Sequence, residues 1–264
     1  MANSQQYDQC RGYQEMKESV PDETKIDHFL TFIFQSGYRT RAVPFRRLGF
    51  TILHPMVAWA AFQHLRRLPV VKVTISSSDR GKALWMYDSR RPWRLHGLVT
   101  SYLEIPSPLS IYWRGSSRHN LRTHTAHAKA EGYQVELVNS PAINGVIAQV
   151  TSDKGWRVIP VESALLRVGG TLDDAICVGV FDSNQRAVAF HVGVQAGNVL
   201  RNVWSYSSQR GSARWLCFSG FIEHASDKGV RFIIEAPPWA LTGGNKVFMR
   251  RLGFTPARVR CQRN

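Results

Sequence analysis

The last third of the chain constrains the fold most, because its hydrophobic pattern changes period in a fixed order. Residues 186–194 alternate apolar and polar side chains like a half-buried strand. Gly197 separates them from a second strand pattern over 199–206, at the spacing of a hairpin. Residues 214–228 then place apolar side chains at helical spacing, and Gly229 ends the pattern. We therefore expect a hairpin followed by a helix.

The same third continues with three shorter elements. The β-branched run 230–236 is short enough to be a buried strand, and Pro237 ends it. Residues 245–252 form a short helix pattern closed by Gly253, and 254–261 return as a last strand. The order strand, strand, loop, helix, strand, helix, strand predicts an α/β fold.

The first part of the chain also alternates helix and strand patterns. Residues 25–35 and 55–68 carry helical apolar faces. The runs 70–75, 82–87 and 96–105 are predicted strands by their β-branched and aromatic content.

Three motifs in the last third resemble those of the GNAT superfamily of N-acyltransferases. They are the loop 208–213 that opens a helix, the strand that carries Glu235, and the run 246–254 followed by Pro256. The resemblance implies an α/β fold with one or two GNAT-like domains, each a mixed, mostly antiparallel sheet flanked by helices.

A basic helix pattern near the middle of the chain resembles the Fem-type branch, in which two GNAT-like domains are joined. Residues 116–122 carry Ser and Arg, and the helix leads into Gly132 and a strand. The resemblance implies a less complete N-terminal GNAT-like domain over 1–110 and a C-terminal acyltransferase domain over 111–264.

Arginines on this helix form a candidate nucleic-acid face. Arg118 and Arg122 are four residues apart and share a helix face, and Arg114 joins them if the helix starts earlier. With Lys129 they could bind phosphates, because an anion relieves the repulsion between like charges at this spacing. A solvated basic face is the equally simple alternative.

In the donor site that the resemblance implies, two parallel strands splay apart. An acyl donor can then pair with their free backbone groups as an extra strand. Donor phosphates would lie at the next helix N-terminus, where backbone N–H groups and the dipole favour anions. The loop match to the superfamily is degenerate and leaves an ordinary helix entry open. The residues expected to bind the donor are Trp204, Ser205, Gln209, Arg210, Gly211, Ser212, Ala213, Asn245 and Arg251.

The resemblance implies acyl transfer to an amine, which needs a proton acceptor and stabilisation of an oxyanion. Glu235, at the end of its strand, is the candidate general base, and a surface carboxylate is the alternative. Tyr206 could protonate the leaving group, and Lys246 or Arg251 could supply a cation near the donor. His191 lies mid-strand and is expected to be a packed histidine.

A metal site is the alternative for the histidine-rich helix. His124 and His127 share a helix face, and Glu131 lies four residues further, with His119 nearby. Solvated or packing histidines are far commoner, so we expect no metal and no cofactor other than the donor.

Charge indicates the class of partner. The 264 residues carry a formal net charge of +15, which favours polyanionic partners such as tRNA. No apolar run reaches the length of a membrane span and the start has no apolar signal core. The four cysteines show no paired spacing, so we expect free thiols in the cytoplasm.

These observations favour an aminoacyltransferase that forms an amide bond between an aminoacyl group from aminoacyl-tRNA and an amine acceptor, a peptide or a small metabolite. The alternatives are an acyl-CoA-dependent N-acyltransferase and a non-catalytic RNA-binding protein on the same fold.

Overall fold

The computed structural model describes residues 23–35, 49–75, 98–152, 160–166, 170–208 and 211–263. The chain divides into two compact units. The smaller contains Met1–Leu68 and Trp239–Thr242, and the larger contains Pro69–Pro238 and Gly243–Asn264. The strand predicted over 82–87 lies outside the described residues.

Among its described residues, the smaller unit includes the helices α2 (Glu23–Gln35) and α4 (Pro55–Arg67), which confirms both helix predictions, and residues 49–53 are also helical. Val57, Ala61 and Leu65 are buried on α4, and their spacing of four places them on one face. Proline suits the first turn of α4, where its missing N–H would have no helical partner.

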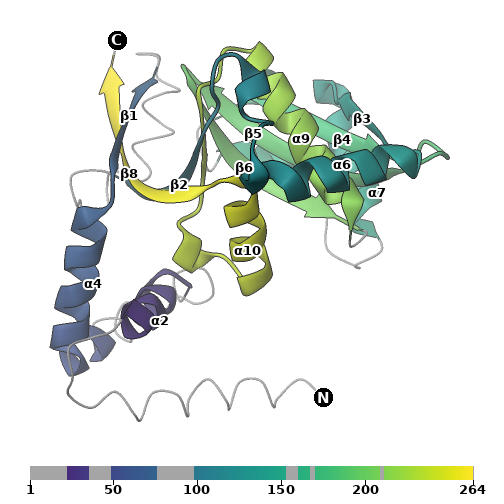
Figure 1. The fold of residues 1–264 in the computed structure, drawn as a ribbon. Coiled ribbons are helices and arrows are strands. Elements are labelled where there is room, and N and C mark those ends of the chain that lie inside the picture. Colours follow the sequence, from purple (N-terminus) through teal and green to yellow (C-terminus); the bar gives the residue numbers. More distant parts are fainter. Residues whose placement is uncertain are drawn as a thin grey trace. The chain divides into compact units, whose positions relative to one another are not determined.

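The larger unit is built on one eight-stranded sheet with the order β1-β8-β2-β7-β6-β5-β4-β3 (Figure 1). Neighbouring strands are antiparallel except for the parallel pairs β1–β8 and β6–β7. The strands are β1 (Val70–Ile75), β2 (Leu98–Glu104), β3 (Gln134–Leu137), β4 (Ala175–Phe181), β5 (Ala187–Ala196), β6 (Val199–Ser207), β7 (Phe232–Glu235) and β8 (Thr255–Arg263).

Helices flank this sheet. The α-helices of the larger unit are α6 (His119–Ala130), α7 (Ile143–Ser152), α8 (Val161–Leu166), α9 (Ser212–Asp227) and α10 (Gly243–Leu252). Its short 3-10 turns are η2 (Leu109–Ile111), η3 (Ser116–Arg118), η4 (Ser140–Ala142) and η5 (Leu172–Asp174), whereas η6 (Pro238–Ala240) has its last two residues in the smaller unit. The predicted fold class is confirmed: the sheet is mixed and mostly antiparallel, and it is consistent with a GNAT-like domain.

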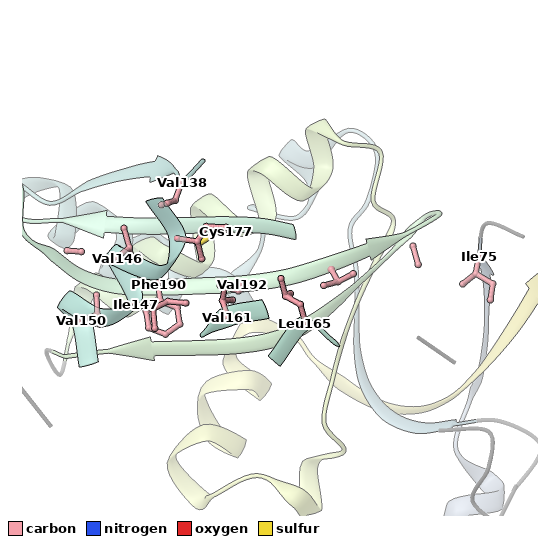
Figure 2. Packing of buried hydrophobic residues seen from close by; sticks show 14 residues of the cluster. Ile75, Val138, Val146, Ile147, Val150, Val161, Leu165, Cys177, Phe190 and Val192 are labelled. Atoms are coloured by element: carbon pink, nitrogen blue, oxygen red, sulfur yellow. The ribbon is translucent and has the colours of Figure 1, made fainter. Parts of the chain in front are cut away.

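Alternation along β5 divides its side chains between two layers. Phe190 and Val192 join Ile147 and Val150 of α7 in one buried cluster (Figure 2). His191, between them in sequence, points to the opposite face, where its ring contacts Phe221 of α9. Each fully buried aliphatic or aromatic side chain contributes about 1.5–3 kcal/mol, so both layers stabilise the central strands.

The hairpin and helix predicted in the last third are confirmed. Gly197 makes the β5–β6 turn with a φ of 64°, a left-handed conformation that glycine adopts without a steric cost. The helix predicted from residue 214 begins at Ser212. Strands on both sides of residue 110 share the one sheet, and the division into GNAT-like domains at that residue stays a prediction.

Candidate functional site

Strands β6 and β7 run parallel for only three residue pairs, from Val199 with Phe232 to Arg201 with Ile234. Strand β7 then ends at Glu235, whereas β6 continues to Ser207. Beyond Arg201, no described strand pairs with β6 on that side. The predicted splay is therefore present, and it leaves backbone groups that an extended ligand can pair with.

A β-bulge lies at the same point. Val192 pairs with Trp204 and Gly193 pairs with Asn202, so Val203 is the extra residue on β6. A bulge redirects the side chains that flank it. Asn202 is thereby placed beside the end of β7, where its side-chain amide donates a hydrogen bond to Glu235 Oε2.

Glu235 lies where the two strands separate. Its Oε1 accepts a hydrogen bond of 2.9 Å from the backbone N–H of Ala236. Removal of water raises the pKa of the carboxyl, although the bonds from Asn202 and Ala236 and the positive charges of Arg201 and Arg214 oppose the shift. A raised pKa makes the carboxylate a better proton acceptor near neutral pH.

Arg214, in the first turn of α9, was not predicted as a site residue. Its guanidinium carbon lies 3.8 Å from the ring centroid of Phe248, and its Nη2 donates a hydrogen bond of 2.9 Å to Asn245 Oδ1. Burial lowers the pKa of the guanidinium. A cation in the first helical turn opposes the helix dipole, and that mismatch was the sequence signal that could have found it.

His191 is the packed histidine that the sequence predicted, and only 3% of its surface is exposed. Its ring centroid lies 4.0 Å from that of Phe221 and 5.0 Å from that of Phe218. Burial, helped by repulsion from Arg214, lowers the pKa of the imidazole to about 3, against the opposing effect of Asn202. The ring is therefore neutral at physiological pH.

A small pocket adjoins these groups on the α9 side of β5 and β6. Ser205 lies directly opposite His191 across the β5–β6 pair. The residues that line the pocket are Phe190, His191, Ser205, Tyr206, Arg214, Cys217, Phe218 and Phe248.

Trp204 and Tyr206 belong mainly to the other layer of the sheet. Both pack against the cluster of α7 and α8, and the Trp204 ring lies 5.2 Å from Phe190 between centroids. Tyr206 also lines the pocket. Ser205 thus lines the pocket with Arg214, which binds Asn245 and is attracted by Glu235, whereas Trp204 packs in the other layer.

The N-terminus of α9 already faces a carboxylate. The Ser212 hydroxyl donates a hydrogen bond to Glu131 Oε2, and His127 Nδ1 lies 3.2 Å from the same oxygen. The hydrogen bond from Ser212 is the largest cause that lowers the pKa of Glu131. Gly211 precedes the helix with a φ of 139°, and Ala213 is buried. Gln209 and Arg210 lie outside the described residues.

The four cations expected to bind nucleic acid have different surroundings. Arg114 and Lys129 are exposed. Arg122 donates hydrogen bonds to the carbonyl oxygens of Trp113 and Gly115, the latter at 2.9 Å. Arg118 packs over the Tyr112 ring at 4.8 Å from its centroid. Two of the four therefore also hold local structure together.

The remaining cations lie on α10, where Lys246 is half-buried and Arg251 is exposed.

The histidines of α6 do not converge, since His124 stacks on Trp215 at 5.0 Å between ring centroids. In the part of the chain that the structure describes, no three His, Cys, Asp or Glu side chains are placed to hold a metal ion. No helix among those residues is long and apolar enough to cross a membrane.

No family model and no curated protein matches the sequence. Several solved structures are similar in fold, including the following three. The C-terminal domain (DUF2156) of an Agrobacterium fabrum protein described as a lysylphosphatidylglycerol synthetase has 9% identity and a TM-score of 0.46, over 61% of this chain and 58% of that chain. FemX has 10% identity and a TM-score of 0.46, over 61% of this chain and 59% of FemX.

The third structure is L-PGS from Bacillus licheniformis, with 12% identity and a TM-score of 0.40, over 56% of this chain and 48% of that chain. The matched part thus spans roughly half to three fifths of each of these structures. The similarity concerns the fold alone.

Proposed function

We propose that this chain forms an amide bond by transferring an aminoacyl group from aminoacyl-tRNA to an amine acceptor. The observation that carries the proposal is the Glu235 carboxylate, held by Asn202 at the point where β6 and β7 separate. A donor that pairs with the free edge of β6 would present its carbonyl next to this carboxylate.

The chemistry follows from that placement. The neutral amine of the acceptor attacks the ester carbonyl of the donor, a C–N bond forms, and the C–O bond to the tRNA ribose breaks. Glu235 takes the proton that the amine loses, and its raised pKa suits this role. The released ribose oxygen takes up a proton, for which the Tyr206 hydroxyl is the proposed source. Lys246 is the proposed cation near the donor.

The choice of donor rests on α9. A coenzyme A pyrophosphate would need the anion-binding end of this helix. The Glu131 carboxylate already accepts the hydrogen bond of Ser212, so a negative charge already lies at this end of the helix. Like charges at this end oppose a bound pyrophosphate. The net charge of +15 favours a polyanionic donor, and tRNA offers far more phosphates than coenzyme A.

A transfer assay tests the proposal. The purified protein is incubated with a bulk tRNA pool charged with labelled amino acids and with dipeptide acceptors. Mild base hydrolyses the ester of unreacted donor and releases its label as free amino acid, so label that remains joined to the acceptor peptide after base is in an amide. We expect base-stable product that depends on the protein and on the acceptor amine. Acetyl-coenzyme A is assayed side by side.

Glu235→Gln supplies the first residue-level prediction. It should lower turnover by about 10²–10⁴-fold, the usual contribution of a general base, while tRNA binding changes little. Glu136→Gln, on the exposed β3, is the matched control and should keep full activity. Full activity in Glu235→Gln would remove Glu235 from the mechanism. Product from acetyl-coenzyme A alone would make the chain an N-acyltransferase, and tRNA binding without any product would make it an RNA-binding protein.

A further inference from the structure

Arg214 is a cation that lacks an anionic partner close by. No carboxylate of the described residues lies within ion-pair distance of it, and its hydrogen bond goes to the neutral amide of Asn245. Glu235 attracts the guanidinium only from further away. Phe248 covers one face of the guanidinium. A partly buried charge in this situation is stabilised when an anion binds its remaining N–H groups.

His191 presents a second group without a partner in the same pocket. Its Nε2 atom is buried and makes no hydrogen bond with the described residues. The Asn202 amide is near enough to influence the pKa of His191, but both His191 Nε2 and Asn202 Oδ1 lack a well-formed hydrogen bond. A neutral imidazole can donate one N–H to an acceptor, and buried polar atoms are rarely left unsatisfied.

The rest of the lining narrows the class of ligand. Ser205 adds a hydroxyl opposite His191. Phe218 and Phe248 form apolar walls, and burial raises the pKa of Cys217, so its thiol stays neutral. The enclosed space is only about 10 Å³, close to the volume that one water needs, and the pocket opens to solvent. One cation and two neutral donors between apolar walls match the two oxygens of a carboxylate.

We propose that this pocket between β5, β6 and the start of α9 binds a carboxylate group of a small ligand, with Arg214, His191 and Ser205 as hydrogen-bond donors. The link to a substrate rests on the proposed function. The α-carboxyl of a charged amino acid is esterified to tRNA. The carboxylate therefore belongs either to the side chain of an acidic aminoacyl group or to an acceptor with a free carboxyl end.

Acetate is the probe for the pocket itself, and acetamide is its neutral counterpart. Titration of the whole chain is followed by the imidazole ¹⁵N resonances of His191 in NMR spectra. Acetate should shift these resonances in a saturable way and acetamide should not. Arg214→Gln should weaken acetate binding roughly tenfold to a hundredfold, the effect of one charge-assisted hydrogen bond. Arg250→Gln, an exposed arginine on α10, should not weaken it.

Ser205→Ala is the second variant, because it removes a donor with little change in packing, and it should weaken acetate binding severalfold. Equal shifts with acetate and acetamide, no shift with acetate, or unchanged binding in folded Arg214→Gln would overturn the proposal. This titration contains no tRNA, so it decides the pocket independently of the transfer reaction.

Two arms of the transfer assay distinguish the sources of the carboxylate. One compares Gly-Gly with Gly-Gly-amide as acceptor, and the other compares aspartyl- and glutamyl-tRNA with asparaginyl- and glutaminyl-tRNA. A preference that disappears in Arg214→Gln assigns the carboxylate to that substrate. Transfer without a preference in either arm overturns the link to the reaction, whereas carboxylate binding without transfer refutes the proposed function alone.

Discussion

Among single side chains, His191 makes stability depend on pH in a predictable direction. Its folded pKa is about 3 and its ordinary value is 6.5, so between these values the unfolded chain binds a proton that the folded chain does not. The stability that His191 confers is therefore present above pH 6.5 and lost as pH falls toward 3. We expect a loss of up to about 1.4 kcal/mol per pH unit, and His191→Leu should remove this slope.

Urea unfolding between pH 7 and pH 4 measures the effect as the difference between His191→Leu and the parent chain. His119→Leu, at an exposed histidine of α6, is the control and should leave the slope unchanged. Glu235 acts in the opposite direction: its raised pKa gives stability that is present below 4.5 and lost as pH rises through the raised value. The comparison of His191→Leu with the parent chain cancels the contribution of Glu235, because both chains contain that residue. An unchanged slope in His191→Leu would contradict the assigned burial.

The site residues divide by the range of the interactions that place them. Glu235 could be proposed from sequence because a strand pattern ends there. Asn202 and His191 could not be assigned a place in the site, since the bulge at Val203 and the β5–β6 register decide where they point. Those depend on pairings between strands, and the sequence shows no local sign of them. Arg214 shows only a weak sign, a cation at a helix start.

Among helices and strands, the junction of α10 and β8 depends on one glycine. Gly253 has a φ of 94°, and the Arg118 guanidinium occupies the space that a Cβ there would fill. Tyr112 donates a hydrogen bond of 2.7 Å to the carbonyl oxygen of Leu252 beside it. Gly253→Ala should destabilise the chain by about 1–3 kcal/mol, because it adds left-handed strain and displaces Arg118.

Denaturant unfolding of matched variants separates the two causes. Gly244→Ala, also in α10, meets no atom within 4 Å and should be neutral or stabilising by up to about 1 kcal/mol. Arg118→Ala in the Gly253→Ala background should cost less than Arg118→Ala alone, since the clash has already displaced the guanidinium. Strict additivity of the two substitutions would show that Arg118 does not pack on Gly253.

Local patterns predicted the hairpin, α9 and α10, but not the order of strands. Strand β2 lies between β7 and β8, and its Ser101 pairs with Glu235, which is 134 positions away in the chain. Periodicity reports which face of a strand is buried and not which strand lies beside it. The parallel β6–β7 pair that opens the candidate site is likewise a long-range feature.

At the scale of the whole molecule, the proposed function requires tRNA binding, which the net charge of +15 favours, and local contacts decide which cations contribute to it. Each cation that neutralises a phosphate steepens the dependence of log K on log salt concentration by about 0.7–0.9. Arg114 and Lys129 are exposed, so Arg114→Gln and Lys129→Gln should each flatten the slope by about that amount. Filter binding of bulk tRNA at several salt concentrations measures it.

The matched control is Arg231→Gln, because that guanidinium is already paired with Glu104 at 3.0 Å and should change the slope little. Arg122→Gln differs from both groups: it removes hydrogen bonds to the Trp113 and Gly115 carbonyls and should lower stability as well as charge. If Arg114→Gln and Lys129→Gln leave the slope unchanged while binding stays salt-dependent, tRNA contacts another face. Arg118 and Arg122 then serve mainly to fix the start of α6, and the exposed cations Arg114 and Lys129 belong to a solvated basic face, the alternative given by the sequence.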